Sequence, residues 1–410
     1  MPERKPPAGE VDPEFAFDPL DTSRTKDSEW LAHVRRGRAV CRPSPGVVYT
    51  SRYAETQETF RDPRRFSSLG DMRAPGVVVP EHERFLGEVD APLHPRIRRI
   101  LQPHFTRRGA DAAEPWTRAS VLRRLQALAS RGSGDLIQSL AIPLPGSVSA
   151  HVLGIPESAH DQVMAWCDEL LHSSWPTTGR TERGDGIAEC FPELAAALDA
   201  LIAEREAAGP EAPDDLLRAM VQTRTEDGWR IDPRHVRTLC VNILSGSLSA
   251  SYMLGNLLYR YLDDAEFAAS IRRDPSLIPA AVEESLRFES PVTFLLRTVR
   301  QDTQLGGCPV RHGEHVMMGI ASANRDESVF EHAGEFRLDR ELPFEHLAFG
   351  SGPHLCVGNH LTRMVGKVVL EETLEEFEPG ELRLVEGYRW ECVAHVHEYG
   401  PETLDVQVRR

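Results

Sequence analysis

The sequence predicts a mainly α-helical protein with a small β portion. Apolar residues recur at helical spacing over three long stretches, 116–207, 239–262 and 359–377. Strand patterns are short, and they lie at 46–50, at 291–297, in a hairpin-like stretch 310–321 and in the tail 380–408. Because no internal repeat or long linker interrupts the chain, we expect a single domain over residues 1–410, with a disordered lead-in over 1–17.

The acidic composition argues against two kinds of partner. The chain carries 63 Asp and Glu residues against 47 Lys and Arg residues, which gives a net charge of −16. That charge disfavours general binding to nucleic acid or to a membrane surface. The first 27 residues are charged and rich in proline, and they contain no apolar run typical of a signal peptide or membrane anchor. We expect a cytoplasmic protein that binds neither nucleic acid nor a membrane.

The seven cysteines indicate a reducing compartment. Their number is odd and no Cys-x-x-Cys pair occurs, so the sequence suggests neither a disulfide framework nor a zinc site. A buried structural role is the usual one for a lone cysteine. Cys356 is the cysteine whose surroundings favour a different role.

The stretch 349–358, Phe-Gly-Ser-Gly-Pro-His-Leu-Cys-Val-Gly, is the most specific motif in the chain. Gly350 and Gly352 allow a tight turn that can direct backbone N–H groups at the sulfur of Cys356. Gly358 leaves room for a flat ligand. The predicted helix 359–377 begins directly afterwards, and the positive end of its dipole favours a thiolate over a thiol. Such a sulfur is a strong electron donor to iron.

This stretch resembles the haem-binding loop of the cytochromes P450, Phe-Gly-x-Gly-x-His-x-Cys-x-Gly, and every fixed position of that loop is filled. The resemblance implies the cytochrome P450 fold, a triangular prism of helices around a buried haem b. It also implies that the Cys356 thiolate is the axial ligand of the haem iron, the only metal ligand expected from the protein. By the same resemblance His354 contacts a haem propionate, and Phe349 and Gly358 belong to the haem-binding loop.

The N-terminal part of the chain is expected to alternate helices and strands. A helix is predicted over 28–36, a strand over 46–50 and a helix over 54–61. Glycine and proline interrupt the apolar residues of 67–82, which predicts a loop there, and 179–185 reads as a flexible connection. The resemblance implies that the 67–82 loop covers the substrate pocket.

His94 and Arg98 form a second motif. Because they are four residues apart, both side chains lie on one face of a helix and can reach the same anion. A solvated basic face is the simpler explanation for any single arginine. The segment Asp90-Ala91-Pro92-Leu93-His94 and Arg98 resembles the family's Asp-x-Pro-x-His-x-x-x-Arg helix, in which the histidine and arginine bind haem propionates.

The apolar stretch 239–262 is expected to form one long helix, and by position it resembles the central helix that crosses the haem in the family. Most members place an acid and a threonine there, which organise the water that delivers protons during dioxygen activation. Here Gly246 is kept, Leu248 replaces the acid and Ser249 replaces the threonine. Ser245, Ser247 and Ser249 could supply the relay, or they could simply bond back to preceding carbonyls and bend the helix. We assign Gly246 and Ser249 catalytic positions, with Ser245 and Leu248 at the substrate pocket.

Glu284 and Arg287 match the Glu-x-x-Arg pair of the family. Residues three apart on a helix can form an ion pair, and the resemblance implies that this pair locks the core beneath the haem. The family often supplies a further arginine just before a phenylalanine, at the position of Glu335 here. Arg337 and Arg340 are the two candidates for the missing cation.

The predicted strand 291–297 carries further site residues. By resemblance Val292, Thr293 and Phe294 flank the haem on the substrate side, and Arg297 is a third propionate contact. Two buried propionates need several cationic or donor groups, because buried carboxylates are costly when unpaired. His94, Arg98, Arg297 and His354 would together meet that need.

The chain contains no flavin or nicotinamide fingerprint and no iron–sulfur cysteine cluster, so its electrons must come from separate proteins. The resemblance implies a ferredoxin and a ferredoxin reductase as partners of a monomeric enzyme.

The sequence thus predicts a haem-thiolate oxidase or monooxygenase that acts on a small molecule, in a pathway of secondary metabolism. The altered relay leaves a second possibility open, an oxidative carbon–carbon or carbon–nitrogen coupling enzyme for aromatic natural products. A third possibility is of another class, a non-catalytic haem-binding partner protein.

Overall fold

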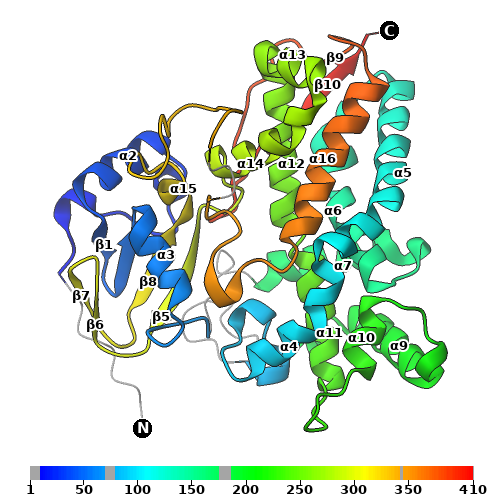
Figure 1. Cartoon of the computed structure of the whole chain (residues 1–410), viewed down its shortest axis with the longest axis horizontal. Coiled ribbons are helices and arrows are strands. Elements are labelled where there is room, and N and C mark those ends of the chain that lie inside the picture. Colours follow the sequence, from blue (N-terminus) through cyan, green and yellow to red (C-terminus); the bar gives the residue numbers. More distant parts are fainter. Residues whose placement is uncertain (1–9, 70–78, 175–185, 342–344, 410) are drawn as a thin grey trace. The chain divides into compact units, whose positions relative to one another are not determined.

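The computed structural model describes residues 10–69, 79–174, 186–341 and 345–409 (Figure 1). For residues 171–174 it describes the backbone alone. The chain divides into two compact units, each assembled from separate stretches of sequence. The first contains residues 1–71, 269–356 and 390–402, and the second contains residues 72–268, 357–389 and 403–410. The predicted connection 179–185 and most of the predicted loop 67–82 lie outside the described residues.

The first unit is built on a five-stranded sheet with strand order β1-β2-β8-β5-β3. Strand β2 pairs with β8 in parallel, and the other neighbours are antiparallel. The strands of this sheet are β1 (Val40–Ser44), β2 (Val47–Thr50), β3 (Phe66–Ser67), β5 (Phe294–Val299) and β8 (His315–Gly319). A separate two-stranded hairpin consists of β6 (Thr303–Leu305) and β7 (Cys308–Val310). Its helices are α1 (Thr22–Thr25), α2 (Ser28–Gly37), α3 (Tyr53–Arg61), α14 (Ile278–Phe288) and α15 (Ile320–Ala323).

Alternating side chains of the sheet enter two apolar cores, as a period of two requires. Val48, Val316 and Met318 lie in one core with residues of α3. Tyr49 and Met317 lie in the other with residues of α2. The predicted elements 28–36, 46–50 and 54–61 are therefore confirmed as α2, β2 and α3.

The expected lead-in over residues 1–17 is wrong for its described part, residues 10–17. Pro13–Phe15 forms a short 3₁₀ helix, and Phe15 and Phe17 are only 3% and 8% exposed. Phe17 packs edge-on against Trp30 and Tyr49, with ring centroids 6.5 and 5.6 Å away. Two buried aromatic rings supply enough apolar contact to order a charged, proline-rich segment.

The expected hairpin over 310–321 is also corrected. Strand β7 pairs with β6 across Gly306 and Gly307, whose φ angles are +53° and +78°. Strand β8 instead lies between β2 and β5 in the main sheet. The consecutive glycines adopt the left-handed conformation that a tight turn needs, so the hairpin forms one strand earlier than the alternation indicated.

The second unit is helical. Its helices are α4 (Leu93–Leu101), α5 (Arg107–Arg131), α6 (Pro143–Leu153), α7 (His160–Ser174), α8 (Gly186–Cys190), α9 (Pro192–Ala208), α10 (Leu216–Gln222), α11 (Pro233–Ser245), α12 (Leu248–Asp263) and α16 (Asn359–Glu376). A small sheet of β4 (Ser133–Asp135), β10 (Asp405–Val408) and β9 (Leu382–Leu384) joins residues that are far apart in sequence. Helix α13 (Ala265–Arg273) runs through the sequence boundary between the units.

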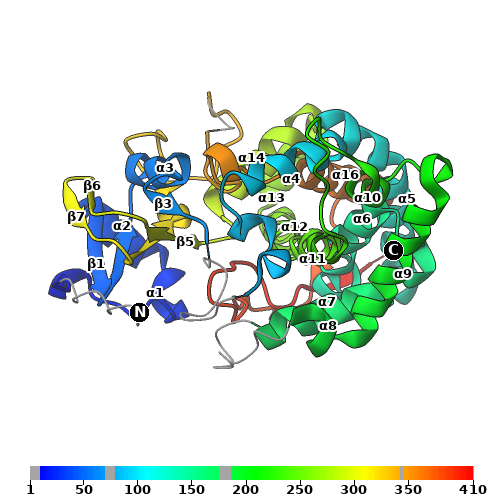
Figure 2. The same cartoon turned by 90° about the horizontal axis from the view of Figure 1, so that it is seen from below.

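Two helices organise the second unit. Helix α16 lies along α5 and also contacts α12 (Figure 1). Helix α11 is surrounded by α6, α7, α9 and α10, and in Figure 2 it is seen almost along its axis. The predicted helix 359–377 is confirmed as α16. In the part of the chain that the structure describes, no helix combines the length and apolar character needed to cross a membrane.

Candidate haem-thiolate site

The loop around Cys356 is held in a tight conformation by glycine and by backbone hydrogen bonds. Gly350 and Gly352 both have φ = +70°, a region that other residues rarely adopt. The N–H of Gly350 donates to the carbonyl of Leu347 at 2.8 Å, and the N–H of Cys356 donates to the carbonyl of Phe349 at 2.9 Å. The loop therefore closes on itself at the residue that carries the thiol.

Helix α3 lies directly against this loop. A Cβ on Gly352 would come within 2.9 Å of the Phe60 carbonyl oxygen and 3.0 Å of the Arg61 Cα atom. The Arg61 Nε–H also donates to the Ser351 hydroxyl at 2.9 Å. The glycine thus serves both the backbone angle and the close approach of two chain segments.

Replacing Gly352 by alanine is expected to destabilise the protein by about 2–4 kcal/mol, since left-handed strain costs about 1–2 kcal/mol and the steric clash adds to it. Gly307→Ala is the matched control, because Gly307 has φ = +78° and no atom within 4 Å of its Cβ position. Urea unfolding of both variants separates the two contributions. Equal losses in the two variants would show that the contact with α3 is unimportant.

Cys356 is the exposed member of the seven cysteines. By contrast Cys41, Cys167 and Cys240 are buried. Burial raises the pKa of Cys41 and of Cys167 to about 12, and it also raises the pKa of Cys240, so these three are neutral thiols near pH 7. The simple alternative for Cys356, a buried structural cysteine, does not hold. An exposed thiol in a glycine cradle fits a haem-thiolate ligand.

Arg297 is placed close to this loop within the first unit. Its side chain is buried at 4% exposure, and its guanidinium carbon lies 5.8 Å from the centre of the Phe60 ring. An atom of the same ring is 3.3 Å from the position of a Cβ on Gly350. Phe60 therefore connects the predicted propionate ligand to the loop. His354 lies partly exposed in the short 3₁₀ helix Gly352–His354 of the loop.

The pair Glu284 and Arg287 forms a buried bidentate ion pair on α14. The two contacts are 2.8 and 2.7 Å long, and the side chains are 3% and 1% exposed. Arg287 also donates to three backbone carbonyls, those of Asn324, Ala333 and Glu335, each at 2.9 Å. Its guanidinium thus ties α14 to the segment that precedes the cysteine loop.

Arg340 supplies the third member of this network. Its Nε–H reaches both carboxylate oxygens of Glu284, at 2.9 and 2.8 Å. Arg337 contributes only its backbone N–H, at 2.7 Å, because its side chain pairs with Asp339. Of the two candidates that the sequence left open, the structure selects Arg340.

His94 and Arg98 lie on α4 of the second unit, four residues apart as expected. His94 is buried at 3% exposure, whereas Arg98 is partly exposed. The helix starts with the His94 N–H donating to the Asp90 carbonyl at 3.0 Å. Gly358, the last residue of the predicted loop, precedes the first residue of α16 in the same unit.

The expected single helix over 239–262 is wrong, because the helix breaks between α11 and α12 at Gly246 and Ser247. The Ser245 hydroxyl donates to the Asn242 carbonyl at 3.3 Å, and the Ser247 hydroxyl donates to the Leu244 carbonyl at 2.6 Å. Serine hydroxyls that bond to preceding carbonyls compete with the helical bonds, and they bend or interrupt helices. The apolar pattern alone did not show this interruption.

Ser249 differs from these two serines. It follows the break, on the first turn of α12, and its side chain is partly exposed, as is that of Leu248. Among the described residues none exchanges a hydrogen bond with the Ser249 hydroxyl. This hydroxyl is therefore available to a water molecule or a substrate, whereas those of Ser245 and Ser247 are engaged.

The predicted substrate-side residues occupy different environments. Val292 packs against the core that contains Phe60, whereas Phe294 lies in the opposite core. Thr293 donates twice to the His397 carbonyl, through its N–H at 2.7 Å and its hydroxyl at 2.9 Å. The strand β5 begins at Phe294, so the regular part of the predicted strand is shorter than expected.

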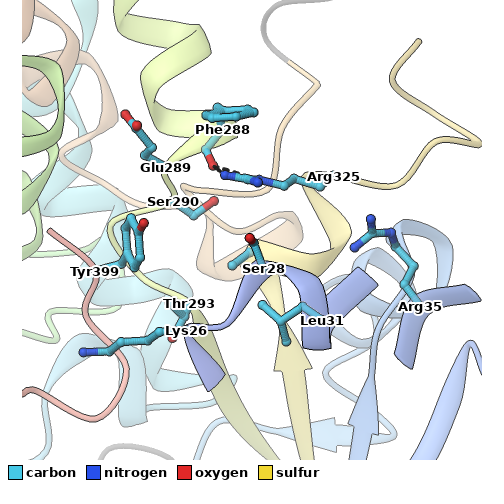
Figure 3. Close-up of a pocket in the computed structure, with 11 residues that line it drawn as sticks. Lys26, Ser28, Leu31, Arg35, Phe288, Glu289, Ser290, Thr293, Arg325 and Tyr399 are labelled. Carbon is cyan, nitrogen blue, oxygen red and sulfur yellow. Dashed lines mark hydrogen bonds between the residues drawn. The ribbon is translucent and has the colours of Figure 1, made fainter. Parts of the chain in front are cut away.

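Thr293 also lines a pocket of about 390 Å³, counting the space open to solvent (Figure 3). Its three cations have internal partners. Arg35 pairs with Glu327 at 3.0 Å, Lys26 donates to the Val393 carbonyl at 2.6 Å, and Arg325 donates to the Phe288 carbonyl at the end of α14. Each of these cations therefore bonds to the protein itself, and only Arg325 bonds to α14. None of the other predicted site residues lines this pocket.

One buried pair next to the loop was missed by the sequence reasoning. His346 and Glu283 form a hydrogen bond of 3.0 Å in the interior. The residues are 63 positions apart, and no local pattern brings a histidine before the loop together with a glutamate on α14.

Comparison with known proteins gives the family. A model of the family described as cytochrome P450 matches residues 258–384. Erythromycin C-12 hydroxylase of Saccharopolyspora erythraea is 32% identical over 85% of this chain and 86% of its own length. Cytochrome P450 107B1 of the same organism is 30% identical over 80% of this chain and 81% of its own length. The chain belongs to the cytochrome P450 family.

A solved structure supports the fold of this P450. The structure of a cytochrome P450 from Chondromyces apiculatus superimposes with a TM-score of 0.84 at 26% identity, covering 96% of this chain and 98% of that one. The prediction of a mainly α cytochrome P450 fold is confirmed. P450s carry haem with a cysteine thiolate as axial ligand, so haem is the cofactor of this protein.

Membership also gives the general class of reaction. The chain is an oxidoreductase of a monooxygenase family whose bacterial members act on small molecules with electrons from redox partners. Some of its relatives are hydroxylases of secondary metabolites.

Proposed function

We propose that this P450 oxidises a small molecule of secondary metabolism, with Cys356 as the thiolate ligand of the haem iron. The observation that carries the proposal is the loop itself. It presents an exposed thiol four residues after the second of two left-handed glycines, Gly350 and Gly352, and it is closed by the bond from the Cys356 N–H to the Phe349 carbonyl. The haem supplies dioxygen activation when it is bound, and the residues of the chain hold it and control access to it.

Four side chains are proposed to hold the haem propionates. They are Arg297 of β5, His354 of the cysteine loop, and His94 and Arg98 of α4. The burial of Arg297 and His94 supports this role, because buried donors facing two carboxylates offset the cost of removing those carboxylates from water. Phe349 and Gly358 complete the haem contacts, and the pair Glu284–Arg287 supports the loop from α14.

The absorption spectrum of the purified protein, reduced and bound to carbon monoxide, tests this assignment. A red-shifted Soret band is expected, because a thiolate is an electron-rich axial ligand. Titration of the ferric form with macrolides, steroids and aromatic natural products then identifies the substrate class through a change of spin state. A well-folded, haem-loaded protein without the red-shifted band would contradict the proposal.

For the proton supply we propose that Ser249 takes the position of the usual threonine. Its hydroxyl can hold the water that delivers protons, whereas Leu248 cannot donate a proton. The glycine at 246 avoids crowding at the break. A Cβ at this position would lie only 3.0 Å from the Asn242 carbonyl oxygen. The route is therefore expected to depend on one hydroxyl, on ordered water and on polar groups of the substrate.

Replacing Ser249 by alanine is expected to lower the yield of oxidised product per electron consumed by about 10-fold, since positioned proton donors contribute about 10²–10⁴-fold and water can partly substitute. Hydrogen peroxide released per electron should rise correspondingly. Ser247→Ala is the control, because the Ser247 hydroxyl is already bonded to the Leu244 carbonyl. If both variants keep the wild-type yield, the substrate or water alone supplies the protons.

The same break favours a second reaction type, oxidative coupling. Two of the three serines at this point are engaged with carbonyls, and Leu248 replaces the acid, so few protein groups are left to deliver protons. In such a coupling, two aromatic O–H or N–H groups would each lose one hydrogen atom and the two radicals would join. The two hydrogen atoms, with two electrons from the redox partner and two protons from solvent, would reduce dioxygen to two water molecules. Product analysis decides between the two reactions. Dimers or cyclised products indicate coupling, and singly hydroxylated monomer from the true substrate excludes it.

The electrons are proposed to come from a ferredoxin and its reductase, with the P450 acting as a monomer. Reconstitution with such a pair also tests the remaining alternative, a non-catalytic haem-binding partner protein. Substrate-dependent turnover excludes that alternative. A spectrally intact P450 that consumes no electrons with any substrate of the panel would favour it.

A further inference from the structure

A buried hydrogen-bond chain leads from helix α14 to the segment before the cysteine loop. The Nε2 atom of His346 lies 3.0 Å from the Oε2 atom of Glu283, and the two side chains are 0% and 3% exposed. On the other side of the ring, the N–H of Ala348 donates to the Nδ1 atom of His346 at 3.2 Å. This series of hydrogen bonds therefore runs from the Glu283 carboxylate through the His346 imidazole to the Ala348 backbone amide.

These contacts assign the tautomer of His346. Because Nδ1 accepts the Ala348 N–H, the ring proton is on Nε2 and is donated to Glu283. Each ring nitrogen then has one partner, and the orientation of the ring is fixed. A histidine held in this way constrains the backbone two residues further along, at Ala348.

The constraint continues to Cys356 through a few contacts. The ring of His346 lies against that of Phe349, with centroids 5.8 Å apart. The Leu347 N–H donates to the side chain of Asn324 at 2.6 Å, and the Leu347 carbonyl accepts from Gly350 at 2.8 Å. The Phe349 carbonyl accepts the N–H of Cys356 itself. Residues 346–349 are thus held on both sides immediately before the loop that carries the thiol.

We infer that Glu283 and His346 are positioning residues that set the geometry of the Cys356 thiolate. The inference rests on the proposed role of Cys356 as the haem ligand. The pair does not touch the sulfur. It acts by holding the Phe349 carbonyl, and hence the Cys356 amide, in place. Groups that orient a metal ligand from behind influence ligand strength as well as binding.

Helix α14 thereby holds the chain before the loop at two points. Glu284 binds the Arg337 N–H and Arg340, and its neighbour Glu283 binds His346. Adjacent residues of a helix point about 100° apart, so the two carboxylates can reach different segments. The Glu284 contacts stabilise residues 335–340. The Glu283 contact holds His346, in the segment 346–349 that directly precedes the cysteine loop.

The test compares Glu283→Ala and Glu283→Gln with the wild-type holoenzyme. Glutamine retains an oxygen that can accept the His346 Nε2–H, so it serves as the conservative variant. Glu314→Gln is the matched control, because Glu314 is a fully buried carboxylate of the same unit that pairs with Arg42 at 2.6 Å and does not contact the loop. The measurements are the Soret band of the reduced, carbon monoxide-bound form and amide hydrogen exchange at Ala348 and Cys356.

Glu283→Ala is expected to lower the ratio of thiolate-ligated to thiolate-free protein by about 10-fold, the lower end for loss of a group behind a metal ligand. Exchange at the two amides should accelerate, and Glu283→Gln should restore most of both signals. Glu314→Gln should leave the ratio and the two amides unchanged whatever it does to stability.

The inference is overturned if Glu283→Ala keeps the wild-type ratio and exchange rates at equal haem content. It is also overturned if Glu314→Gln lowers the ratio as much, because general destabilisation would then explain both. These results differ from a failure of the proposed function, in which the wild-type protein itself lacks the red-shifted band.

Discussion

The Cys356→Ser variant is expected to lose the red-shifted Soret band of the reduced, carbon monoxide-bound protein, and its turnover should fall to background. A serine hydroxyl is not ionised near neutral pH, so it cannot replace the electron donation of a thiolate. The fold should survive, since Cys356 is exposed and the main-chain bond from residue 356 to the Phe349 carbonyl does not involve the side chain. Far-ultraviolet circular dichroism checks that point.

Cys308→Ser provides the matched control for this experiment. Cys308 is a partly exposed cysteine of the same unit, on β7 in the small hairpin. Its replacement should leave the band and the turnover unchanged. A Cys356→Ser protein that retains the band would mean that another residue binds the iron, and loss of the band in Cys308→Ser would mean that the effect is not specific to the loop.

The second large effect is expected at the ion pair of α14. Glu284→Ala should lower the free energy of unfolding by about 3–5 kcal/mol, because it leaves the buried guanidinium of Arg287 without its carboxylate. Arg340 loses the same partner. The loss should appear as a lower urea midpoint with an unchanged slope, measured at equal haem content because a bound cofactor adds to stability.

The arginines of the segment 335–340 supply the control for that measurement. Arg340→Ala removes a guanidinium that is 7% exposed and bonded to Glu284, and it should cost about 1.5–3 kcal/mol, as expected for hydrogen bonds to charged groups. Arg337→Ala removes an exposed pair with Asp339 and should cost no more than about 1 kcal/mol. The reverse order would show that Arg337, and not Arg340, completes the network.

Local signals in the sequence were sufficient for much of the architecture. The glycine-rich loop, the helix that follows it and the pair Glu284–Arg287 each depend on residues close together in sequence, and all were anticipated. The succession of strand β2 and helix α3 was predicted for the same reason. The spacing of apolar residues changes from that of a strand to that of a helix between these neighbouring segments.

The remaining features depend on contacts between distant residues. Phe15 and Phe17 lie in a charged segment, and their packing against α2 and β2, together with hydrogen bonds from Asp12 and Phe17 to β1, orders residues 10–17. The choice of Arg340 over Arg337 depends on which side chain reaches α14, and spacing alone does not decide it. The pair Glu283–His346 joins positions far apart in the chain, and the break at Gly246 depends on serine hydroxyls whose orientation no pattern of apolar residues records.

The exposure of Cys356 also makes the cofactor content of the protein measurable by simple chemistry. A small alkylating reagent reaches an exposed sulfur before it reaches thiols that burial keeps protonated, such as Cys41 and Cys167. A sulfur bound to iron is protected from the reagent. The fraction of peptide 356 that becomes alkylated in a brief exposure is therefore a direct count of the molecules that lack haem, in a purified sample or in a cell extract, without any need for the substrate.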